Sequence, residues 1–182
     1  MLKLIPTHTN DEGYAFIEEL MHTSFPEVER RDDEAQRENT DRNPLFTVNL
    51  VTDEKEDGTI IKVGVITVWS FKNFHYLEHF ATAPAVRNMG YGKRIMDALL
   101  SSMEGLVVLE VEEPEDELTS RRVGFYSRCG FKLCPHDYIQ PAYRPDGESI
   151  PLKIMYRGQN SLDANFEEVR DTLYREVYST YK

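Results

Sequence analysis

Apolar and polar positions in the first quarter of the chain indicate a short strand, a helix and a charged segment. Residues 2–6, "LKLIP", form the strand. Asn10 or Asp11 then precedes apolar residues at helical spacing, which predicts a helix capped by one of these side chains and ended by Pro26. Its apolar stripe consists of Phe16, Ile17, Leu20, Met21 and Ser24. Residues 28–43 are too polar for a core strand, and we interpret them as either a solvated helix or a mobile flap.

In the middle of the chain the apolar residues recur at every second position. Segments 45–53 and 59–71 both alternate in this way, and the turn between them contains Asp-Gly. Gly58 supplies the positive φ that a tight turn requires, so we expect an antiparallel hairpin. Segment 74–84, "FHYLEHFATAP", predicts a third strand.

The second half alternates helices with strands. A helix begins at the glycines of "GYGKRIMDALLSSM" and ends at Gly105, with one apolar face made of Ile95, Leu99, Leu100 and Met103. The continuous apolar run 106–113 is typical of a buried central strand. Thr119 or Ser120 is expected to cap the next helix, "RRVGFYSRCG".

The last quarter predicts a short strand at 131–134, a proline-rich loop at 139–151, a strand at 152–157 and a final helix. The stripe of that helix consists of Leu162, Phe166, Val169, Leu173 and Val177. The order of elements predicts an α/β (α+β) sandwich. We expect a mixed, mostly antiparallel sheet of about seven strands, with helices on both faces and a parallel pair near its centre.

Composition and charge narrow the classes of function. The chain of 182 residues is expected to fold as a single domain, 1–182, and 40% of its residues are hydrophobic. Its net charge of −11 disfavours binding to nucleic acid and favours an amine-bearing partner, although solubility alone would also explain it. No apolar run approaches a bilayer span or a signal peptide, so we expect a cytoplasmic protein that does not bind membranes. Cys129 and Cys134 are interpreted as reduced, packed thiols.

The loop "RNMGYG" lies between the third strand and a helix and contains two glycines. A P-loop is excluded because Arg87 stands at its first glycine position and Arg94 follows Lys93 where a hydroxyl residue is needed. A dinucleotide fingerprint is excluded because Ile95 replaces its third glycine. The pattern that fits is Q/R-x-x-G-x-G/A.

Such a loop can bind phosphate through its backbone, or it can be an ordinary start of a helix. Glycines let the N–H groups approach an anion closely, and the helix dipole adds partial positive charge. Two basic side chains supply formal charge nearby. The residues concerned are Arg87, Asn88, Met89, Gly90, Tyr91, Gly92 and Lys93.

Four segments in this order resemble the Gcn5-related N-acetyltransferase (GNAT) family: "YLEHFATAP", "RNMGYG", "LEVEEPED" and "GFYSRCGF". The resemblance covers residues 45–134 closely, and the flanking residues match only in pattern. It implies an enzyme that moves the acetyl group of acetyl-CoA to a primary amine, by direct attack within a ternary complex and without a metal.

By this resemblance, pantetheine lies where the strand that ends at Thr82 splays from the strand that begins near Leu106. Phe80 and Thr82 would pair with it as a neighbouring strand does, and the N–H of Phe80 or Ala81 would hold the thioester carbonyl oxygen. Other members carry Asn and Ala where this chain has Thr119 and Arg122, so we expect these two side chains to contact the cofactor differently.

Two proton transfers accompany acyl transfer to an amine. Glu78 is the preferred base because it lies two residues before Phe80, hence on the same strand face. Glu110 and Glu112 are the alternatives. By resemblance, Tyr126 is the acid that reaches the sulfur.

His79 is expected to point to the opposite face from Glu78 and to be structural. The tyrosines Tyr138, Tyr143 and Tyr156 either line an acceptor pocket or cover the sheet. Glu29, Arg30 and Arg31 belong either to a lid over the site or, as we prefer, to a solvated face.

The acceptor is not identified by the sequence, and we expect a small amine. A catalytically silent acetyl-CoA-binding module and a transferase that uses another acyl-CoA are the competing functions. The final striped helix also allows a homodimer.

Overall fold

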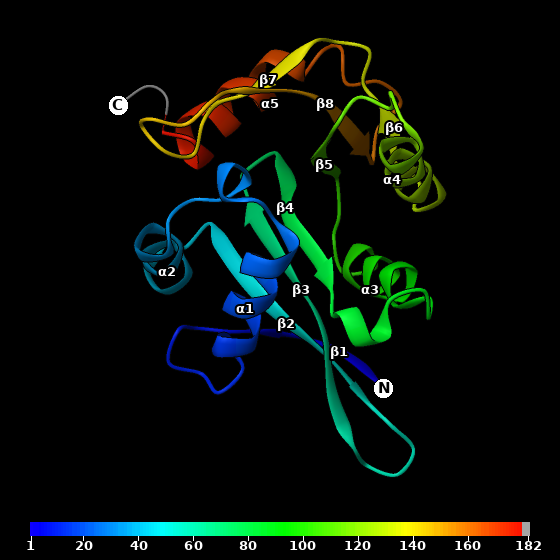
Figure 1. The fold of residues 1–182 in the computed structure, drawn as a ribbon. Coiled ribbons are helices and arrows are strands. Elements are labelled where there is room, and N and C mark those ends of the chain that lie inside the picture. The colour runs from blue at the N-terminus through cyan, green and yellow to red at the C-terminus, as the bar shows by residue number, and fades with distance from the viewer. Residues whose placement is uncertain (180–182) are drawn as a thin grey trace.

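The computed structural model describes residues 1–179 (Figure 1). Its α-helices are α1 (Tyr14–Ser24), α2 (Asp33–Arg42), α3 (Tyr91–Leu100), α4 (Glu117–Arg128) and α5 (Phe166–Thr172). Short 3-10 turns occur at η1 (Glu27–Glu29) and η2 (Pro84–Val86), and α5 continues into a π-helical segment, η3 (Leu173–Val177). The strands are β1 (Leu2–Pro6), β2 (Phe46–Glu54), β3 (Ile60–Ser70), β4 (Phe74–Thr82), β5 (Leu106–Val111), β6 (Lys132–Leu133), β7 (Tyr138–Gln140) and β8 (Ile150–Arg157).

These strands form one mixed sheet in the order β1-β2-β3-β4-β5-β8-β6, and β7 pairs with β8. All neighbours are antiparallel except β4 and β5. The predicted fold class is therefore confirmed. The extra strand relative to the expected seven is β7, whose last two residues begin the segment that we had expected to be a loop.

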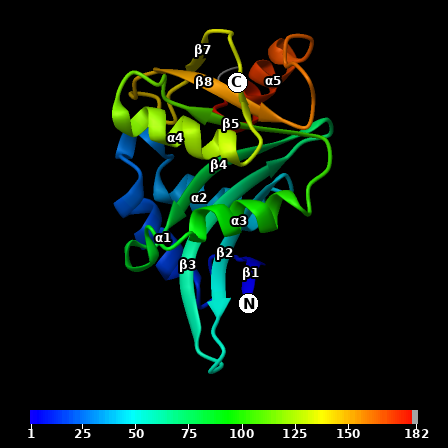
Figure 2. The same ribbon diagram turned by 90° about the vertical axis from the view of Figure 1, so that its right-hand side faces the viewer.

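Helices lie on both faces of the sheet (Figures 1 and 2), and a hydrophobic cluster covers each face. Helices α1 and α5 pack with one cluster, and α3 contributes the core of the other, which α4 also contacts. The predicted stripe of the last helix is buried throughout, although its first residue, Leu162, precedes α5 and its last two lie in η3. The alternating and helical patterns thus identified the core correctly.

The helix ends differ from the sequence-based expectations. Helix α1 begins after Gly13 without a side-chain cap, because the carboxylate of Asp11 accepts the N–H of His8 instead. Helix α3 ends at Leu100, before the expected Gly105. Asp116 is the cap of α4, and its carboxylate and the hydroxyl of Thr119 form a reciprocal capping box.

The ladder between the parallel strands is short. It runs from the pair Phe74 and Leu106 to the pair Leu77 and Leu109, and then stops. Beyond that point β5 remains paired with β8, whereas β4 remains paired with β3 as far as Thr82. The predicted splay of the central pair is therefore present, and it leaves one edge of β4 without a strand partner.

A β-bulge interrupts β4 beside this splay. Ile66 pairs with Phe80 and Val68 pairs with Leu77, so Thr67 alone opposes both Glu78 and His79. The hydroxyl of Thr67 accepts the His79 N–H at 2.9 Å. Because the bulge adds a residue, the strict alternation of faces is lost.

Because of the bulge, these side chains do not point to the faces of the sheet that the sequence predicted. Glu78 and His79 both lie on the α1 face, where Glu78 contacts Trp69 and His79 packs on Phe25. Phe80 instead packs toward the α3 face, beside Phe125. Glu78 therefore does not share a face with Phe80, and His79 is not opposite Glu78.

Candidate active site

The loop before α3 has the backbone geometry that binds anions. Gly90, the N-cap of α3, has φ +78°, and Asn88 has φ +63°. Both values lie in the left-handed region, which turns successive N–H groups toward the same side. The first amides of an α-helix also have no partner within the helix. The N-terminus of α3 is thus free to donate to an anion.

A hollow of about 510 Å³ opens beside this N-terminus. It is lined by Thr82, Arg87, Asn88, Gly90, Gly92, Lys93, Phe125 and Arg128. Three of these side chains are basic, and a Cβ on Gly92 would lie 3.4 Å from the Phe125 ring. An open, basic hollow at a helix N-terminus fits a diphosphate group.

Two residues of the loop turn their side chains away from this hollow. Tyr91 is buried, and its hydroxyl donates to the carboxylate of Asp53 at 2.6 Å. Met89 is 62% exposed and does not line the hollow. Tyr91 can offer an anion only its backbone N–H, and the N–H of Met89 donates to the Val86 carbonyl oxygen at 3.4 Å, a long bond that an anion would replace.

A second cavity, of about 310 Å³, lies along the splay and contains most of the predicted site. Its walls include Glu29, Glu78, His79, Phe80, Ala81, Thr82, Arg87, Glu110, Glu112, Arg122, Tyr126, Gln140 and Tyr143. Thr82 and Arg87 line both hollows. The Arg87 Nε donates to the carbonyl oxygen of Thr82 at 3.4 Å, at the junction between them.

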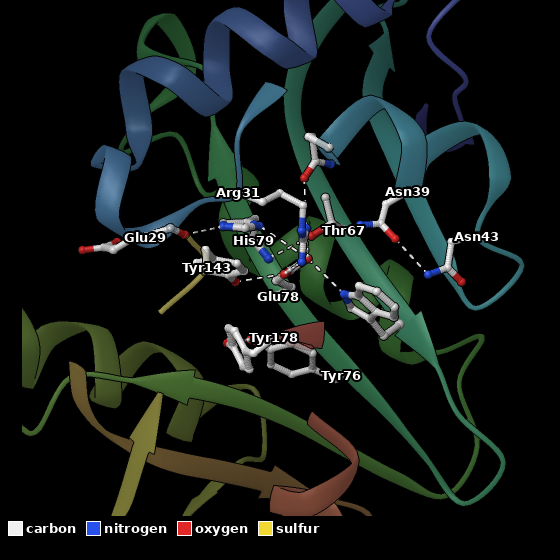
Figure 3. Close-up of polar contacts among 12 residues, drawn as sticks. Glu29, Arg31, Asn39, Asn43, Thr67, Tyr76, Glu78, His79, Tyr143 and Tyr178 are labelled. Atoms are coloured by element: carbon white, nitrogen blue, oxygen red, sulfur yellow. Dashed lines mark hydrogen bonds and ion pairs between the residues drawn. The ribbon is translucent and has the colours of Figure 1, made fainter. Parts of the chain in front are cut away.

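The carboxylate of Glu78 is fully buried and surrounded by donors (Figure 3). The guanidinium of Arg31 pairs with both of its oxygens, Trp69 Nε1 donates at 3.0 Å and the Tyr143 hydroxyl at 2.9 Å. Burial alone would raise the pKa of Glu78, but Arg31 and the neighbouring His79 outweigh it and hold the pKa well below its usual range. Glu78 is therefore a weak base.

Arg31 is the main partner of Glu78, and its side chain is only 5% exposed. Its guanidinium lies over the rings of Phe46, Trp69 and Tyr143, with centroid distances of 5.0 to 5.7 Å. The preferred interpretation of this segment as a solvated face is therefore wrong for Arg31. Burial of the guanidinium is possible because Glu78 neutralises it.

His79 lies beside Glu78 and fixes the segment before α2. Its Nε2 donates to the carbonyl oxygen of Glu29 at 2.9 Å (Figure 3). Its Nδ1 is buried without a hydrogen bond and lies 3.7 Å from Glu78 Oε2. His79 therefore lines the cavity, although the sequence predicted that it would point to the face of the sheet opposite Glu78.

Glu110 is the other buried carboxylate of the cavity. It accepts hydroxyl groups from Tyr76 at 2.8 Å, from Tyr178 at 2.7 Å and from Tyr138. Burial raises the pKa of Glu110 despite the opposing effect of these three donors. No basic side chain pairs with it among residues 1–179. A carboxylate with a raised pKa and an oxygen at the cavity wall is a better base than Glu78.

Tyr126 projects from α4 into the same cavity. Burial raises its pKa to about 12, so the phenol stays protonated at neutral pH. No hydrogen bond from its hydroxyl to a described residue is present, and Phe125 and Phe131 pack against its ring. The O–H is thus available to a ligand.

Two other predicted residues of α4 differ in role: one stabilises the start of the helix and the other lines the cavity. Thr119 does not line the cavity because its hydroxyl completes the capping box with Asp116, so a contact of its side chain with the cofactor is not supported. Arg122 lines the cavity and pairs with Glu112.

The three tyrosines that were predicted either to line an acceptor pocket or to cover the sheet have different positions. Tyr143 lines the cavity, Tyr138 donates a hydrogen bond to Glu110, and Tyr156 donates to the Asn160 carbonyl oxygen.

Other chemistry expected or excluded from the sequence has these outcomes. Cys129 and Cys134 are buried free thiols, as expected. Residues 1–179 contain no group of three or more His, Cys, Asp or Glu placed to hold a metal ion. In the same range no helix is long and apolar enough to cross a bilayer.

Arg31, His79 and Gln140 are the residues of this region that sequence reasoning missed. The bulge that turns His79 to the cavity leaves no trace in the alternation of "YLEHFAT". Gln140 belongs to β7, which is only three residues long. The one sequence signal that Arg31 belongs to the site was its position in a segment that could form a lid over it.

The comparisons with known proteins agree with this geometry. The model of the acetyltransferase (GNAT) family matches residues 14–131. A solved structure from Bacteroides thetaiotaomicron that is assigned to the GNAT family has 41% identity and a TM-score of 0.90, over 97% of this chain and 98% of that chain. None of the curated proteins compared with the chain matches it.

More distant structures share the fold. An aminoglycoside 6'-N-acetyltransferase solved with coenzyme A has 17% identity and a TM-score of 0.57, over 86% of this chain and 96% of that chain. A variant of spermidine N-acetyltransferase from Vibrio cholerae has 13% identity and a TM-score of 0.60, over 86% and 94%. With more than half of its length matched by the family model and a 41% identical relative along nearly all of it, this chain belongs to the GNAT family of acetyltransferases.

Proposed function

We propose that the protein, as a single domain, transfers the acetyl group of acetyl-CoA to a primary amine of a small molecule by direct attack in a ternary complex. One observation carries this proposal. The basic hollow at the α3 N-terminus and the carboxylate-lined cavity share Thr82 and Arg87, so they form one continuous site. One end of this site suits the diphosphate of a thioester carrier and the other suits an amine.

The residues that would hold the carrier follow from this arrangement. The backbone N–H groups from Met89 to Lys93 and the side chain of Arg87 would bind the diphosphate. The unpaired edge of β4 from Phe80 to Thr82 would bind the pantetheine amides, and the N–H of Phe80 or Ala81 would donate to the thioester carbonyl oxygen. When bound, the carrier supplies an acetyl thioester, which an amine can attack.

We assign removal of the amine proton to Glu110. An alkyl ammonium with a pKa of about 10.4 must lose a proton before it attacks, and a carboxylate with a raised pKa accepts it more readily than one with a lowered pKa. Burial raises the pKa of Glu110, whereas Arg31 keeps the pKa of Glu78 low. Glu78 then acts as a positioning residue that fixes Arg31 and the bulge.

Tyr126 would stabilise the departing thiolate by donating a hydrogen bond to it. Complete transfer of its proton is disfavoured, since its pKa of about 12 exceeds the pKa of a thiol, about 8.5. Glu110 takes one proton from the ammonium before attack, and the C–S bond breaks as the C–N bond forms. The second proton that leaves the nitrogen passes to solvent, from which the thiolate takes a proton. Positioning of the two substrates supplies most of the rate.

An acetyl-transfer assay tests this proposal. The protein is incubated with acetyl-CoA and a panel of amines, and free thiol is measured. In Glu110→Gln and Tyr126→Phe we expect turnover to fall by about tenfold or more, while thermal protection by CoA is retained. Tyr156→Phe is the matched control, because its hydroxyl donates to Asn160 outside the cavity.

The competing functions predict other results in the same assay. Thermal protection by CoA without thiol release would identify a silent binding module. Thiol release that is faster with another acyl-CoA would identify a different acyl donor. Absence of both protection and turnover in the folded protein would overturn the proposal.

A further inference from the structure

The cavity is lined by a carboxylate that forms no ion pair or hydrogen bond with a described residue. Glu29 ends η1, is half-buried and lines the cavity. Its backbone carbonyl is held by His79, which fixes the position of the residue (Figure 3). Its own carboxylate makes no hydrogen bond or ion pair with any residue in 1–179. A fixed carboxylate without a partner inside a binding cavity favours a cationic ligand.

A second carboxylate of the same cavity interacts with Glu29 through its charge. Glu112 follows β5, lines the same cavity and pairs with Arg122. Burial and then the charge of Glu112 raise the pKa of Glu29, while Arg122 and His79 oppose this effect. The two carboxylates come from separate elements and repel each other across the cavity. A cation placed beside Glu29 would relieve that repulsion.

Gln140 is an independent indication of a polar ligand in the same cavity. Its side chain lines the cavity and is 95% buried, being only 5% exposed. Its carboxamide forms no hydrogen bond with any described residue. The carboxamide is not among the fully buried unpaired groups, so it is open to the cavity and available to a ligand.

Apolar side chains line the space between these polar groups. Phe25, Ile150 and Leu152 contribute to the same cavity, together with the ring of Tyr143. These side chains can contact the methylene chain of an alkyl amine, while the polar groups that make up most of the lining remain for its charged ends. The combination therefore selects for a chain that is apolar in the middle and cationic at its ends.

We infer that the acceptor is an aliphatic diamine, whose second ammonium group is held by Glu29 and the carbonyl of Gln140. This inference rests on the proposed acetyl transfer to a primary amine. Glu110 takes the proton of the reacting amine, Glu78 is neutralised by Arg31 and Glu112 by Arg122. Glu29 is then the charge that remains for the distal ammonium.

Three acceptors of similar length test the inference with the wild-type protein. We expect kcat/KM for 1,4-diaminobutane to exceed that for n-butylamine by about tenfold or more, because a hydrogen bond to a charged group contributes that factor. The third acceptor, 4-aminobutanoate, places a carboxylate near Glu29 and should be the poorest. Equal values for the diamine and n-butylamine would overturn the inference and leave the proposed function intact.

Two variants of the same turn sharpen the test. Glu29→Gln should reduce the ratio of the diamine to the monoamine by about tenfold. Glu27→Gln is the matched control, since Glu27 is exposed, pairs with Arg144 and does not line the cavity, and it should leave the ratio unchanged. A ratio that persists in Glu29→Gln would contradict the inference. If no amine is acetylated although CoA protects the protein, the proposed function fails and the inference with it.

Discussion

At the scale of single residues, the two buried carboxylates of the cavity differ because of their neighbours. Glu78 faces a guanidinium, whereas the groups of residues 1–179 that donate hydrogen bonds to Glu110 are phenolic hydroxyls. Both residues are glutamates, but their neighbours make Glu78 a member of an ion pair and Glu110 a proton acceptor. Sequence position gave no means of separating these two roles.

The pH dependence of the reaction provides a test of the assignment to Glu110. Since burial raises its pKa, kcat/KM should fall as pH falls through a value above the ordinary glutamate pKa of about 4.3. This acid limb should keep its position with acceptors of different amine pKa, and it should disappear in Glu110→Gln. A limb that moves with the amine would show that the acceptor, and not Glu110, is being titrated.

The buried pair of Arg31 and Glu78 should dominate local stability. Arg31→Met leaves an uncompensated buried carboxylate and should lower the free energy of unfolding at pH 7 by about 3–5 kcal/mol, measured with urea. Arg31→Met combined with Glu78→Gln should cost less than the sum of the single changes. Arg144→Met, at a more exposed ion pair, is the control and should change the free energy of unfolding little.

The same pair makes a prediction about pH with a defined sign. In the wild type the lowered pKa of Glu78 contributes stability that is present above about pH 4.3 and is lost as pH falls. In Arg31→Met the carboxylate has lost its cation, so protonation relieves the penalty instead. The difference between the two proteins should therefore narrow between pH 7 and pH 4. A constant difference would mean that Arg31 acts mainly through packing on its three aromatic neighbours.

At the scale of elements, interruptions in regular structure position the site. The bulge in β4 places Glu78 and His79 side by side, and the end of the ladder at Leu77 leaves the following edge of the strand open. A regular strand would have sent one of these two side chains to the α3 face. The site thus depends on the two places where the sheet departs from its ideal pattern.

The left-handed turn before α3 should be required for binding of the carrier. Gly90→Ala has room for the new methyl group, so its cost is conformational and about 1–2 kcal/mol, because φ is +78°. We expect weaker CoA binding by calorimetry, since any relaxation of this turn redirects the amides. Gly58→Ala is the matched control, because it has the same conformational cost at φ +82° in the β2–β3 turn, outside the hollow, and should bind CoA as the wild type does. Unchanged affinity in Gly90→Ala would contradict this role of the turn.

Much of the fold followed from sequence patterns, and the exceptions have physical causes. Alternation and the Asp-Gly turn identified the hairpin, and the apolar run after Gly105 identified the central strand. The cap of α4 was misplaced because Thr119 and Asp116 share one reciprocal motif. Within the candidate site, the glycine loop, Glu110 and Tyr126 belong to the segments that resemble the GNAT family, so the sequence was enough to name them. The burial of Arg31 depends on a partner 47 residues away, which no local pattern encodes.

At the scale of the whole molecule, charge is divided between the two ends of the site. The protein has a net charge of −11, yet the hollow at the α3 N-terminus is lined by Arg87, Lys93 and Arg128. The cavity at the other end is lined by four glutamates, two of which pair with arginines. An anionic carrier is therefore attracted locally against the overall field, while a cationic acceptor is attracted by the field as well.

This division predicts that salt affects acceptors according to their charge. Raising ionic strength from about 0.01 M to about 0.15 M shortens the Debye length from about 30 Å to about 8 Å, which screens the net charge of −11. At saturating acetyl-CoA, kcat/KM for 1,4-diaminobutane should fall as salt is added. The logarithm of kcat/KM should fall about twice as steeply for this diamine as for n-butylamine, because the electrostatic attraction scales with the charge of the acceptor. Sucrose at matched viscosity is the control for slower diffusion. Equal slopes for the two amines would show that the field of the molecule does not contribute to acceptor capture.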